Sequence, residues 1–337
     1  MTTQPKQHTV CPKCHSTFTV KKGKRRNRLQ IVQVFQCTDC THRFSTNAGK
    51  NKKYPLHLIL EAASLYNLGY SVTETQQVLR KKKNINIPER TINLWLADHK
   101  ELLSYSHLRR AGKALYPPSR AIRSLTLFHQ QVYRFQVHQP KQELLFQAPE
   151  HQHLMPIIQY FSGVDARFPH HLFQQVVHRS STFPALINPP VVRKENQATR
   201  LAALVLPTSP TNKKRHETLQ RFMLINDSVT VAVEVPVYLT REDIAYYRSQ
   251  GFNLPFESEV ITGHIDLLQV RNGFLHILDY KPDARKEKHA HVQLTIYALA
   301  LSRRVGLPLK NFKCAWFDER DYFEFFPLQG VYERRGK

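Results

Sequence analysis

The stretch "GHIDLLQVRNGFLHILDYKP" (residues 263–282) has the pattern of two β-strands joined by a short turn. Asn272-Gly273 is a preferred pair for a two-residue type I′ turn, and the flanking residues are mostly apolar. The stretch nevertheless contains Asp266 and Asp279, followed by Lys281. Aspartate is depleted in strands, and a buried charge is costly unless it is paired or binds a metal. These three charged residues therefore require a functional explanation.

Alternation along the second strand places Asp279 and Lys281 on one face. If Asp266 lies across from them, two carboxylates and an ammonium converge at one end of the hairpin. Two carboxylates can hold Mg²⁺, which keeps several waters and binds phosphate oxygens. Such a metal lowers the pKa of a bound water, and the lysine can position that water or neutralise the transition-state charge. The alternative is a hairpin with solvent-facing acids and a lysine at its edge.

This region resembles the PD-(D/E)XK nuclease superfamily, and in particular its RecB-like branch, over roughly residues 195–320. That branch carries the motifs G-x-x-D, D-Y-K and Q-x-x-x-Y in this order. The corresponding residues here are Gly263–Asp266, Asp279–Tyr280–Lys281 and Gln293–Tyr297. The resemblance implies an α/β restriction-endonuclease-like core.

The resemblance also implies a role for each matching residue. Asp266 and Asp279 would bind Mg²⁺ or Mn²⁺, together with the carbonyl oxygen of Tyr280. Lys281 would be catalytic. Further along the chain, two residues of the following helix would orient the site or contact DNA: Gln293 and Tyr297.

The family's first motif is a glutamate or histidine on a preceding helix. His216, Glu217 and Glu234 are the candidates here for a further ligand of the Mg²⁺ ion, and His216 is preferred because the RecB-like branch commonly uses histidine. Some relatives hold an iron–sulfur cluster with four cysteines around this domain. Only Cys314 lies in this region, so no cluster is expected, and Cys314 is interpreted as a small buried hydrophobe.

The other four cysteines form two C-x₂-C pairs separated by 22 residues: Cys11, Cys14, Cys37 and Cys40. A two-residue gap lets both thiolates of a pair reach one tetrahedral ion, and the intervening segment can return as a hairpin. The spacing predicts a zinc ribbon over residues 1–50, with a strand before Cys37 and Phe18 and Phe44 following the two pairs. The Zn²⁺ is expected to be structural because four thiolates complete its shell. A redox dithiol is the alternative, but no βαβ context accompanies the pairs.

Between the cysteine pairs lies "KKGKRRNR" (residues 21–28), which predicts a basic loop. Its candidate phosphate contacts are Lys21, Arg25 and Arg26. A solvated loop without a partner is the equal alternative.

Residues 51–105 predict a three-helix DNA-binding domain. Ser71 and Glu74 have capping-box spacing at the second helix, and Pro88 begins the third. "LYNLGYS" and "ERTINLWL" resemble the helix-turn-helix of bacterial and archaeal transposases and resolvases. The third helix would turn one side toward the core (Ile92, Trp95 and Leu96) and the other toward DNA (Arg90, Thr91 and Asn93). A protein-interaction bundle is the alternative.

Residues 106–190 predict a linker and helical region without assigned chemistry, including an amphipathic helix that ends before Pro140. Residues 191–337 are the predicted nuclease domain. This gives four segments: a ribbon, a helix-turn-helix, a connecting region and an α/β core.

Charge supports a nucleic-acid partner. The 337 residues carry a net charge of +23, and residues 1–120 alone hold 22 basic and 6 acidic residues, a net of +16. No apolar run approaches a membrane span and no secretory signal is evident, so a cytoplasmic bacterial or archaeal protein without a membrane partner is expected.

The favoured function is Mg²⁺-dependent hydrolysis of DNA phosphodiester bonds by a deoxyribonuclease that the zinc ribbon and the helix-turn-helix direct to DNA. The arrangement suggests a mobile element, genome defence or DNA processing. A non-enzymatic DNA-binding protein with an inactive nuclease scaffold is one alternative, and an enzyme acting on RNA or branched DNA is another.

Overall fold

The computed structural model describes residues 9–26, 31–45, 54–165, 168–174, 178–179, 187–209, 211 and 214–332. The chain divides into two compact units, Met1–Ala62 and Ala63–Lys337, and the boundary falls inside helix α1 (Leu56–Leu68). None of the described helices combines the length and the apolar character that a membrane span requires.

The first unit contains a three-stranded antiparallel sheet in the order β1-β2-β3. Its strands are β1 (Thr19–Arg26), β2 (Ile31–Cys37) and β3 (Arg43–Ser45). The strand predicted before Cys37 is therefore confirmed. Phe44 is buried beside Cys11 and Cys37, whereas Phe18 is 69% exposed.

The basic loop predicted for residues 21–28 is wrong for its first six residues, which belong to β1. They form a strand because they pair with β2 as the chain returns from one cysteine pair to the other. A bulge between Lys21 and Lys24 interrupts the pairing, and Gly23 there has a φ of +84°, which glycine adopts without steric cost. Residues 27 and 28 lie outside the described part of the chain.

Helices α2 (Val72–Lys83) and α3 (Glu89–Asp98) follow α1. The capping box is confirmed: Glu74 N–H donates to Ser71 Oγ (3.1 Å), and Ser71 N–H donates to Glu74 Oε2 (2.6 Å). As predicted, α3 begins directly after Pro88. On α3, Ile92 and Trp95 are buried, and Leu96 is half-buried.

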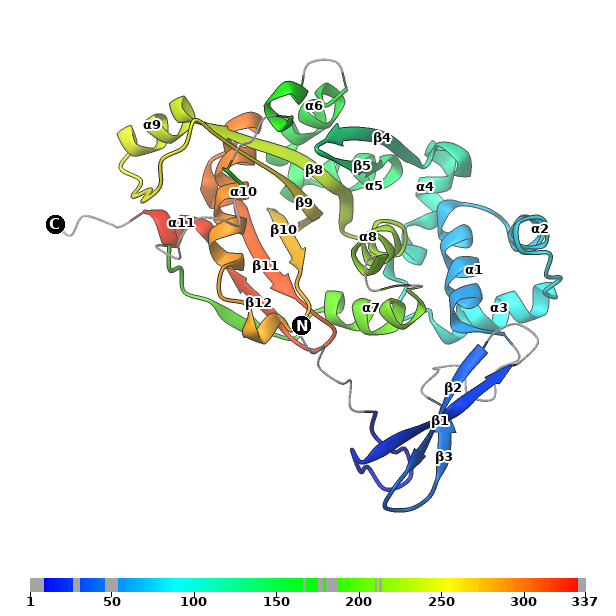
Figure 1. The fold of residues 1–337 in the computed structure, drawn as a ribbon. Coiled ribbons are helices and arrows are strands. Elements are labelled where there is room, and N and C mark those ends of the chain that lie inside the picture. The colour runs from blue at the N-terminus through cyan, green and yellow to red at the C-terminus, as the bar shows by residue number, and fades with distance from the viewer. Residues whose placement is uncertain are drawn as a thin grey trace. The chain divides into compact units, whose positions relative to one another are not determined.

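In the second unit the described strands form one nine-stranded mixed sheet, in the order β4-β5-β8-β9-β10-β11-β12-β7, with β6 paired to β9 (Figure 1). The strands are β4 (Ile122–His129), β5 (Gln131–His138), β6 (His178–Arg179), β7 (Val192–Lys194), β8 (Thr230–Thr240), β9 (Val260–Arg271), β10 (Phe274–Tyr280), β11 (Phe312–Phe317) and β12 (Tyr322–Phe325). The pairs β10/β11 and β6/β9 are parallel, and the other pairs are antiparallel. The second unit thus has the mixed α/β core that the sequence predicts.

Helix α10 (Ala290–Val305) makes the crossover between the parallel strands β10 and β11, and packs on the sheet. Helix α8 (Arg215–Asn226) packs on β8 and β9. The remaining α-helices of this unit are α4 (Arg109–Leu115), α5 (Gln139–Phe146), α6 (Pro156–Gly163), α7 (Gln197–Val205), α9 (Arg241–Ser249) and α11 (Pro327–Val331). Strands β8 to β11 and helix α10 contribute most of the buried apolar core.

The turn predicted from Asn272-Gly273 is confirmed. Arg271 pairs with Phe274, and the two turn residues have φ angles of +52° and +74°, as a type I′ turn requires. From this turn the β9–β10 pairing continues to Leu267 and Leu278. The next residue on each strand is one of the two aspartates.

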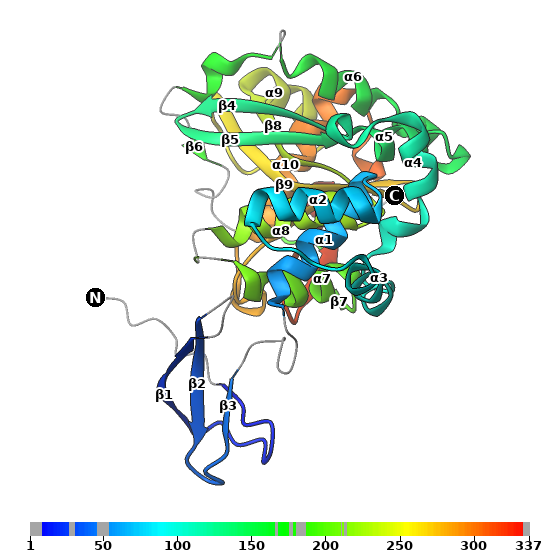
Figure 2. The same cartoon turned by 90° about the vertical axis from the view of Figure 1, so that its right-hand side faces the viewer.

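The amphipathic helix predicted to end before Pro140 is wrong. Residues 122–138 form the β4–β5 hairpin, which Figure 2 shows beside β8, and α5 begins at Gln139 with Pro140 in its first turn. Proline is tolerated there because the first N–H groups of a helix have no partner within it. The sheet therefore begins at Ile122, inside the segment predicted as a connecting region.

Candidate functional site

A cavity of about 250 Å³ opens at the end of the β9–β10 hairpin that lies away from its turn. It is lined by most of the residues that the motifs predict: His216, Glu234, Gly263, Asp266, Asp279, Lys281, Gln293 and Tyr297. These residues come from α8, β8, β9, β10 and α10, so the fold assembles the site from segments far apart in the sequence.

Asp266 is held by two hydrogen bonds to one carboxylate oxygen. Its Oδ2 accepts from the backbone N–H of Tyr280 (3.3 Å) and from His216 Nδ1 (3.2 Å). Burial raises the pKa of Asp266, but the hydrogen bond and charge of His216 outweigh it and hold the pKa below its ordinary value. Asp266 is therefore ionised and can bind a cation.

Asp279 lies beside Asp266 and is almost fully buried. Burial and the negative charge of Asp266 together raise the pKa of Asp279 to about 8, despite the nearby Lys281 ammonium. Lys281 Nζ lies 2.8 Å from Asp279 Oδ2, an ion pair without hydrogen-bond geometry. Two carboxylates in contact repel each other unless a proton or a cation lies between them.

Lys281 is oriented by helix α10. Its Nζ donates to Gln293 Oε1 (3.1 Å), and Gln293 Nε2 donates to the Tyr297 hydroxyl (3.0 Å). Gln293 and Tyr297 are four residues apart, so both side chains lie on one face of the helix. Burial lowers the pKa of Lys281, but the attraction of Asp279 outweighs it, so the lysine remains protonated.

Gly263 explains why the first aspartate motif begins with glycine. A Cβ atom at this position would lie 2.2 Å from Tyr297 Cε1 and 2.6 Å from its hydroxyl oxygen. Any side chain at residue 263 would therefore displace the tyrosine ring, and with it the hydrogen bond from Gln293. Gly263 of the G-x-x-D motif and Tyr297 of the Q-x-x-x-Y motif are therefore in direct contact.

The three first-motif candidates differ in position. His216 and Glu234 line the cavity, and Glu234 Oε1 accepts from Gln220 Nε2 (2.8 Å). Burial, followed by the charge of Asp266, raises the pKa of Glu234 to about 8. The side chain of Glu217 is 65% exposed and pairs with Arg134 (3.8 Å), away from the described cavity lining. His216 is the candidate in direct contact with an aspartate.

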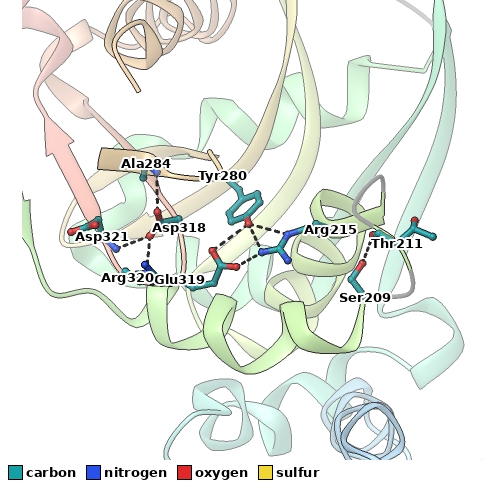
Figure 3. Close-up of polar contacts among 9 residues, drawn as sticks. All are labelled: Ser209, Thr211, Arg215, Tyr280, Ala284, Asp318, Glu319, Arg320 and Asp321. Carbon is teal, nitrogen blue, oxygen red and sulfur yellow. Dashed lines mark hydrogen bonds and ion pairs between the residues drawn. The ribbon is translucent and has the colours of Figure 1, made fainter. Parts of the chain in front are cut away.

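A second set of polar contacts, shown in Figure 3, holds the Tyr280 side chain at the end of β10. The Tyr280 hydroxyl accepts from Arg215 Nη2 (2.8 Å), and Arg215 also forms an ion pair with Glu319. The ring of His216 lies edge-on to that of Tyr280, with 5.1 Å between the centroids. These contacts fix the first turn of α8, and therefore the position of His216 over Asp266.

The loop after Lys281 is tied to the β11–β12 turn. Asp318 Oδ2 accepts from Ala284 N–H (2.9 Å), and Asp318 Oδ1 accepts from the N–H groups of Arg320 (2.7 Å) and Asp321 (2.8 Å) (Figure 3). The indole N–H of Trp316 donates to the Ala284 carbonyl (3.0 Å). The chain therefore leaves the site along a defined path.

The donor set fits Mg²⁺ or Mn²⁺. Two adjacent carboxylates provide hard oxygen ligands, and Asp279 Oδ2 is buried without a hydrogen-bond donor. Asp266, Asp279 and the Tyr280 carbonyl would hold the ion, with His216 beside them. Water and substrate would complete the shell, because these metals keep several waters.

One of the comparisons with known proteins gave a match. Residues 166–323 match the model of the PD-(D/E)XK nuclease superfamily. This segment contains Glu217, Glu234, Asp266, Asp279 and Lys281. The searches of curated proteins and of solved structures gave no match.

The sequence interpretation missed part of the cavity wall, which is built from aromatic rings. His129, Tyr133, Phe173 and His264 line it, and the first two come from the β4–β5 hairpin. The alternation of apolar and polar residues from Leu125 to Val137 was the available signal, because it has the period of a strand rather than of a helix.

The four N-terminal cysteines form a second candidate metal centre. Their sulfur atoms all lie within 4.8 Å of one another, and they are the only group of three or more His, Cys, Asp or Glu ligands so close together among the described residues. Cys11 and Cys40 sulfurs are 3.6 Å apart, and those of Cys14 and Cys37 are 3.5 Å apart. A tetrahedral zinc site with Zn–S bonds of about 2.3 Å requires sulfur separations of about 3.8 Å. The geometry fits Zn²⁺.

We expect Gly263→Ala to lower the melting temperature and the catalytic rate, because the added methyl group displaces Tyr297. Overpacking of this kind typically costs about 1–3 kcal/mol. Thermal melting and a cleavage assay would measure both effects. The matched control is Gly163→Ala on α6, where an added Cβ meets no atom within 4 Å. Equal behaviour of the two variants would contradict the proposed contact.

We expect the purified chain to contain one zinc ion and Cys37→Ser to lose it, because three thiolates and a hydroxyl hold Zn²⁺ poorly. Atomic emission measures the metal content. The control is Cys314→Ser, since Cys314 is buried in the second unit and lies outside the cysteine cluster. Zinc bound equally by the Cys37→Ser protein would show that the cluster is not the site.

Proposed function

We propose that this protein is a Mg²⁺- or Mn²⁺-dependent deoxyribonuclease of the RecB-like kind. The observation that carries the proposal is the convergence of Asp266, Asp279 and Lys281 on one cavity, with His216 bonded to the first aspartate. Placing two carboxylates side by side in a largely buried site is unfavourable, and a bound cation would offset this cost. An inactive scaffold has no physical reason to keep this arrangement.

The residues of the site have distinct tasks in the proposed reaction. Asp266 and Asp279 bind the cation, and the hydrogen bonds from His216 and Tyr280 N–H keep the Asp266 carboxylate oriented. A bound Mg²⁺ supplies a Lewis acid for the phosphate and a water of lowered pKa as nucleophile.

Lys281 acts on the phosphate. Its ammonium group is half-buried beside Asp279 and is held by Gln293, so it can stabilise the negative charge that develops on a phosphate oxygen without first reorganising. Tyr297 holds Gln293 in turn. Gln293 and Tyr297 are thus positioning residues for the catalytic lysine.

DNA targeting is assigned to the N-terminal segments. In the zinc ribbon, the exposed side chains of Lys21 and Arg25 lie on β1; Arg26 ends the same strand, and its side chain is not described. On α3, Arg90 and Asn93 are exposed and Thr91 is half-buried, which is compatible with contacts to a DNA groove. The charge of +16 within residues 1–120 supports the assignment.

The same proposal includes a helix-turn-helix that binds duplex DNA. It also includes a cytoplasmic role in a bacterium or archaeon, in a mobile element, genome defence or DNA processing. They rest on the resemblance of residues 51–105 to transposases and resolvases and on the order of the segments.

We expect the parent chain to cut DNA with Mg²⁺ or Mn²⁺, not with EDTA, and Lys281→Ala to cut at least about 100-fold more slowly, because it lacks the charge that stabilises the transition state. Linear and circular duplexes would be tested in parallel, since cutting of the circle identifies an endonuclease. Lys310→Ala is the matched control, because Lys310 is exposed and outside the cavity lining. DNA binding without cutting by all three proteins would favour the inactive scaffold.

We expect Arg90→Ala to weaken duplex binding by about 1–3 kcal/mol if Arg90 contacts a base, and to reduce the salt dependence by about one counterion if it contacts phosphate. Binding isotherms at several salt concentrations distinguish these contacts. The control is Lys310→Ala, which removes an exposed positive charge that lies outside residues 51–105. Unchanged affinity and salt slope for Arg90→Ala would remove it from the interface.

A further inference from the structure

The small sheet of the first unit has two unlike faces. One face carries Phe35 and Phe44, which are paired across β2 and β3 and pack on the cysteine cluster. Val20 pairs with Gln36, the neighbour of Phe35 on β2, so its side chain leaves the other face of the sheet. The sheet therefore covers the cysteines with one face, and the face that carries Val20 stays open.

Phe18 and Val20 form an apolar pair on this open face. Phe18 lies directly before β1 and two residues before Val20, so alternation along an extended chain places both side chains on one side. The two residues are 69% and 45% exposed. Phe44, which follows the second cysteine pair at the matching distance, is buried instead. The ring of Phe18 thus has no packing task in the ribbon that explains its presence.

The backbone of Phe18 is nevertheless fixed. Its N–H donates to Ser16 Oγ (3.0 Å), and its carbonyl accepts from both the N–H and the hydroxyl of Thr38 (3.0 Å each). The contact with Thr38 continues the β1–β2 pairing one residue beyond Cys37. The ring therefore projects from a defined point of the ribbon, which reduces the entropy lost when a flat ligand binds to it.

The surroundings of the apolar pair are basic. The described residues of the ribbon, 9–26 and 31–45, include seven lysines or arginines and one acid, Asp39. Exposed Lys22 and Lys24 follow on β1, and exposed Arg43 lies in the same cross-strand row as Val20. Nucleic acid offers a polyanionic backbone together with apolar base faces. Charge complementarity therefore favours nucleic acid over an apolar protein surface as the occupant of the open face.

We propose that the ring of Phe18, with Val20 beside it, contacts the face of a nucleobase in the bound DNA, while the basic residues of β1 and β3 bind the flanking phosphates. The inference rests on the proposed targeting of DNA by the zinc ribbon, and it adds a contact that does not depend on charge. Aromatic rings stack on unpaired bases, and apolar side chains also enter between the base steps of a duplex. Both are contacts with base faces.

The first test separates the ring from the charges. In the full-length Lys281→Ala chain, without added Mg²⁺, we expect Phe18→Ala to bind DNA about 5- to 100-fold more weakly, the range for loss of one base–aromatic contact. The salt dependence should stay the same, because no phosphate contact is removed. Phe18→Tyr keeps the ring and should retain the affinity.

The matched control is Tyr246→Ala, because Tyr246 is 43% exposed and lies on α9 in the second unit. Equal losses in Phe18→Ala and Tyr246→Ala, or a Phe18→Ala chain that binds DNA as tightly as its parent, would overturn the inference.

The same isotherms on a blunt duplex and on a single strand of the same sequence identify the source of the base. A loss of affinity on the single strand alone assigns the ring to an unpaired base. A loss on the duplex alone assigns it to a base step that the ring enters. Unchanged affinity on both would contradict any contact with a base.

The second test observes the ring directly. Phe18→Trp places an exposed indole in the ribbon, whereas the two native tryptophans, Trp95 and Trp316, are buried. Relative to the parent chain, we expect DNA to quench the added fluorescence because a base lies against the indole. Heparin, a polyanion without bases, should leave it unchanged. Equal quenching by both ligands, or by neither, would overturn the inference.

Zinc content and melting temperature of Phe18→Ala show whether the fold is intact. We expect both to match the parent, because Phe18 is not among the described side chains that pack on the cysteine cluster. A clearly lower melting temperature would show that the ring packs on another part of the chain, and would overturn the inference.

The inference and the proposed function fail separately. A chain that contacts DNA through Phe18 but cuts no DNA with Mg²⁺ or Mn²⁺ would retain the base contact and overturn the nuclease. A chain that cuts DNA, but whose Phe18→Ala variant binds DNA unchanged, would retain the nuclease and overturn the base contact. If Lys21→Ala and Arg25→Ala weaken binding and Phe18→Ala does not, the ribbon binds phosphates alone.

Discussion

The burial of two neighbouring carboxylates is the constraint on which the rest of the second unit depends. The β9–β10 pairing brings Asp266 and Asp279 together, and each then needs its own compensation. His216 supplies it for the first, and Lys281 for the second. Removing either partner leaves an uncompensated charge in a largely buried site. Helix α8 and the loop after β10 must therefore adopt one position relative to the hairpin.

Two further groups of contacts hold these segments in position. Behind the strand end, Arg215 and Glu319 fix Tyr280 and the first turn of α8. On the cavity side, Tyr297 fits against the backbone of Gly263 and supports the Gln293 amide that holds Lys281. None of these contacts touches the reacting atoms in the proposed mechanism. They define the geometry because residues around a catalytic group must be fixed before charge develops on the substrate.

Local signals in the sequence were reliable where a few neighbouring residues decide the conformation. The type I′ turn at Asn272-Gly273 and the capping box at Ser71 depend only on short-range sterics and hydrogen bonds, and both are present. The prediction failed for the helix before Pro140, because Tyr133–Val137 alternates with the period of a strand and β5 pairs with β4 and β8. The basic segment before Arg26 was also misjudged, since charged residues form a strand when a partner strand lies beside them.

The sequence by itself determined the motif residues and their order, the hairpin that brings two aspartates together, and the four-cysteine cluster. Those features follow from spacing, turn chemistry and ligand type. Only the tertiary structure decided that Glu217 is exposed while His216 contacts Asp266, and that Tyr133 lines the same cavity as the carboxylates. The reason is physical: one residue of helical rotation changes the face a side chain occupies, and contacts between distant strands leave no local pattern in the chain.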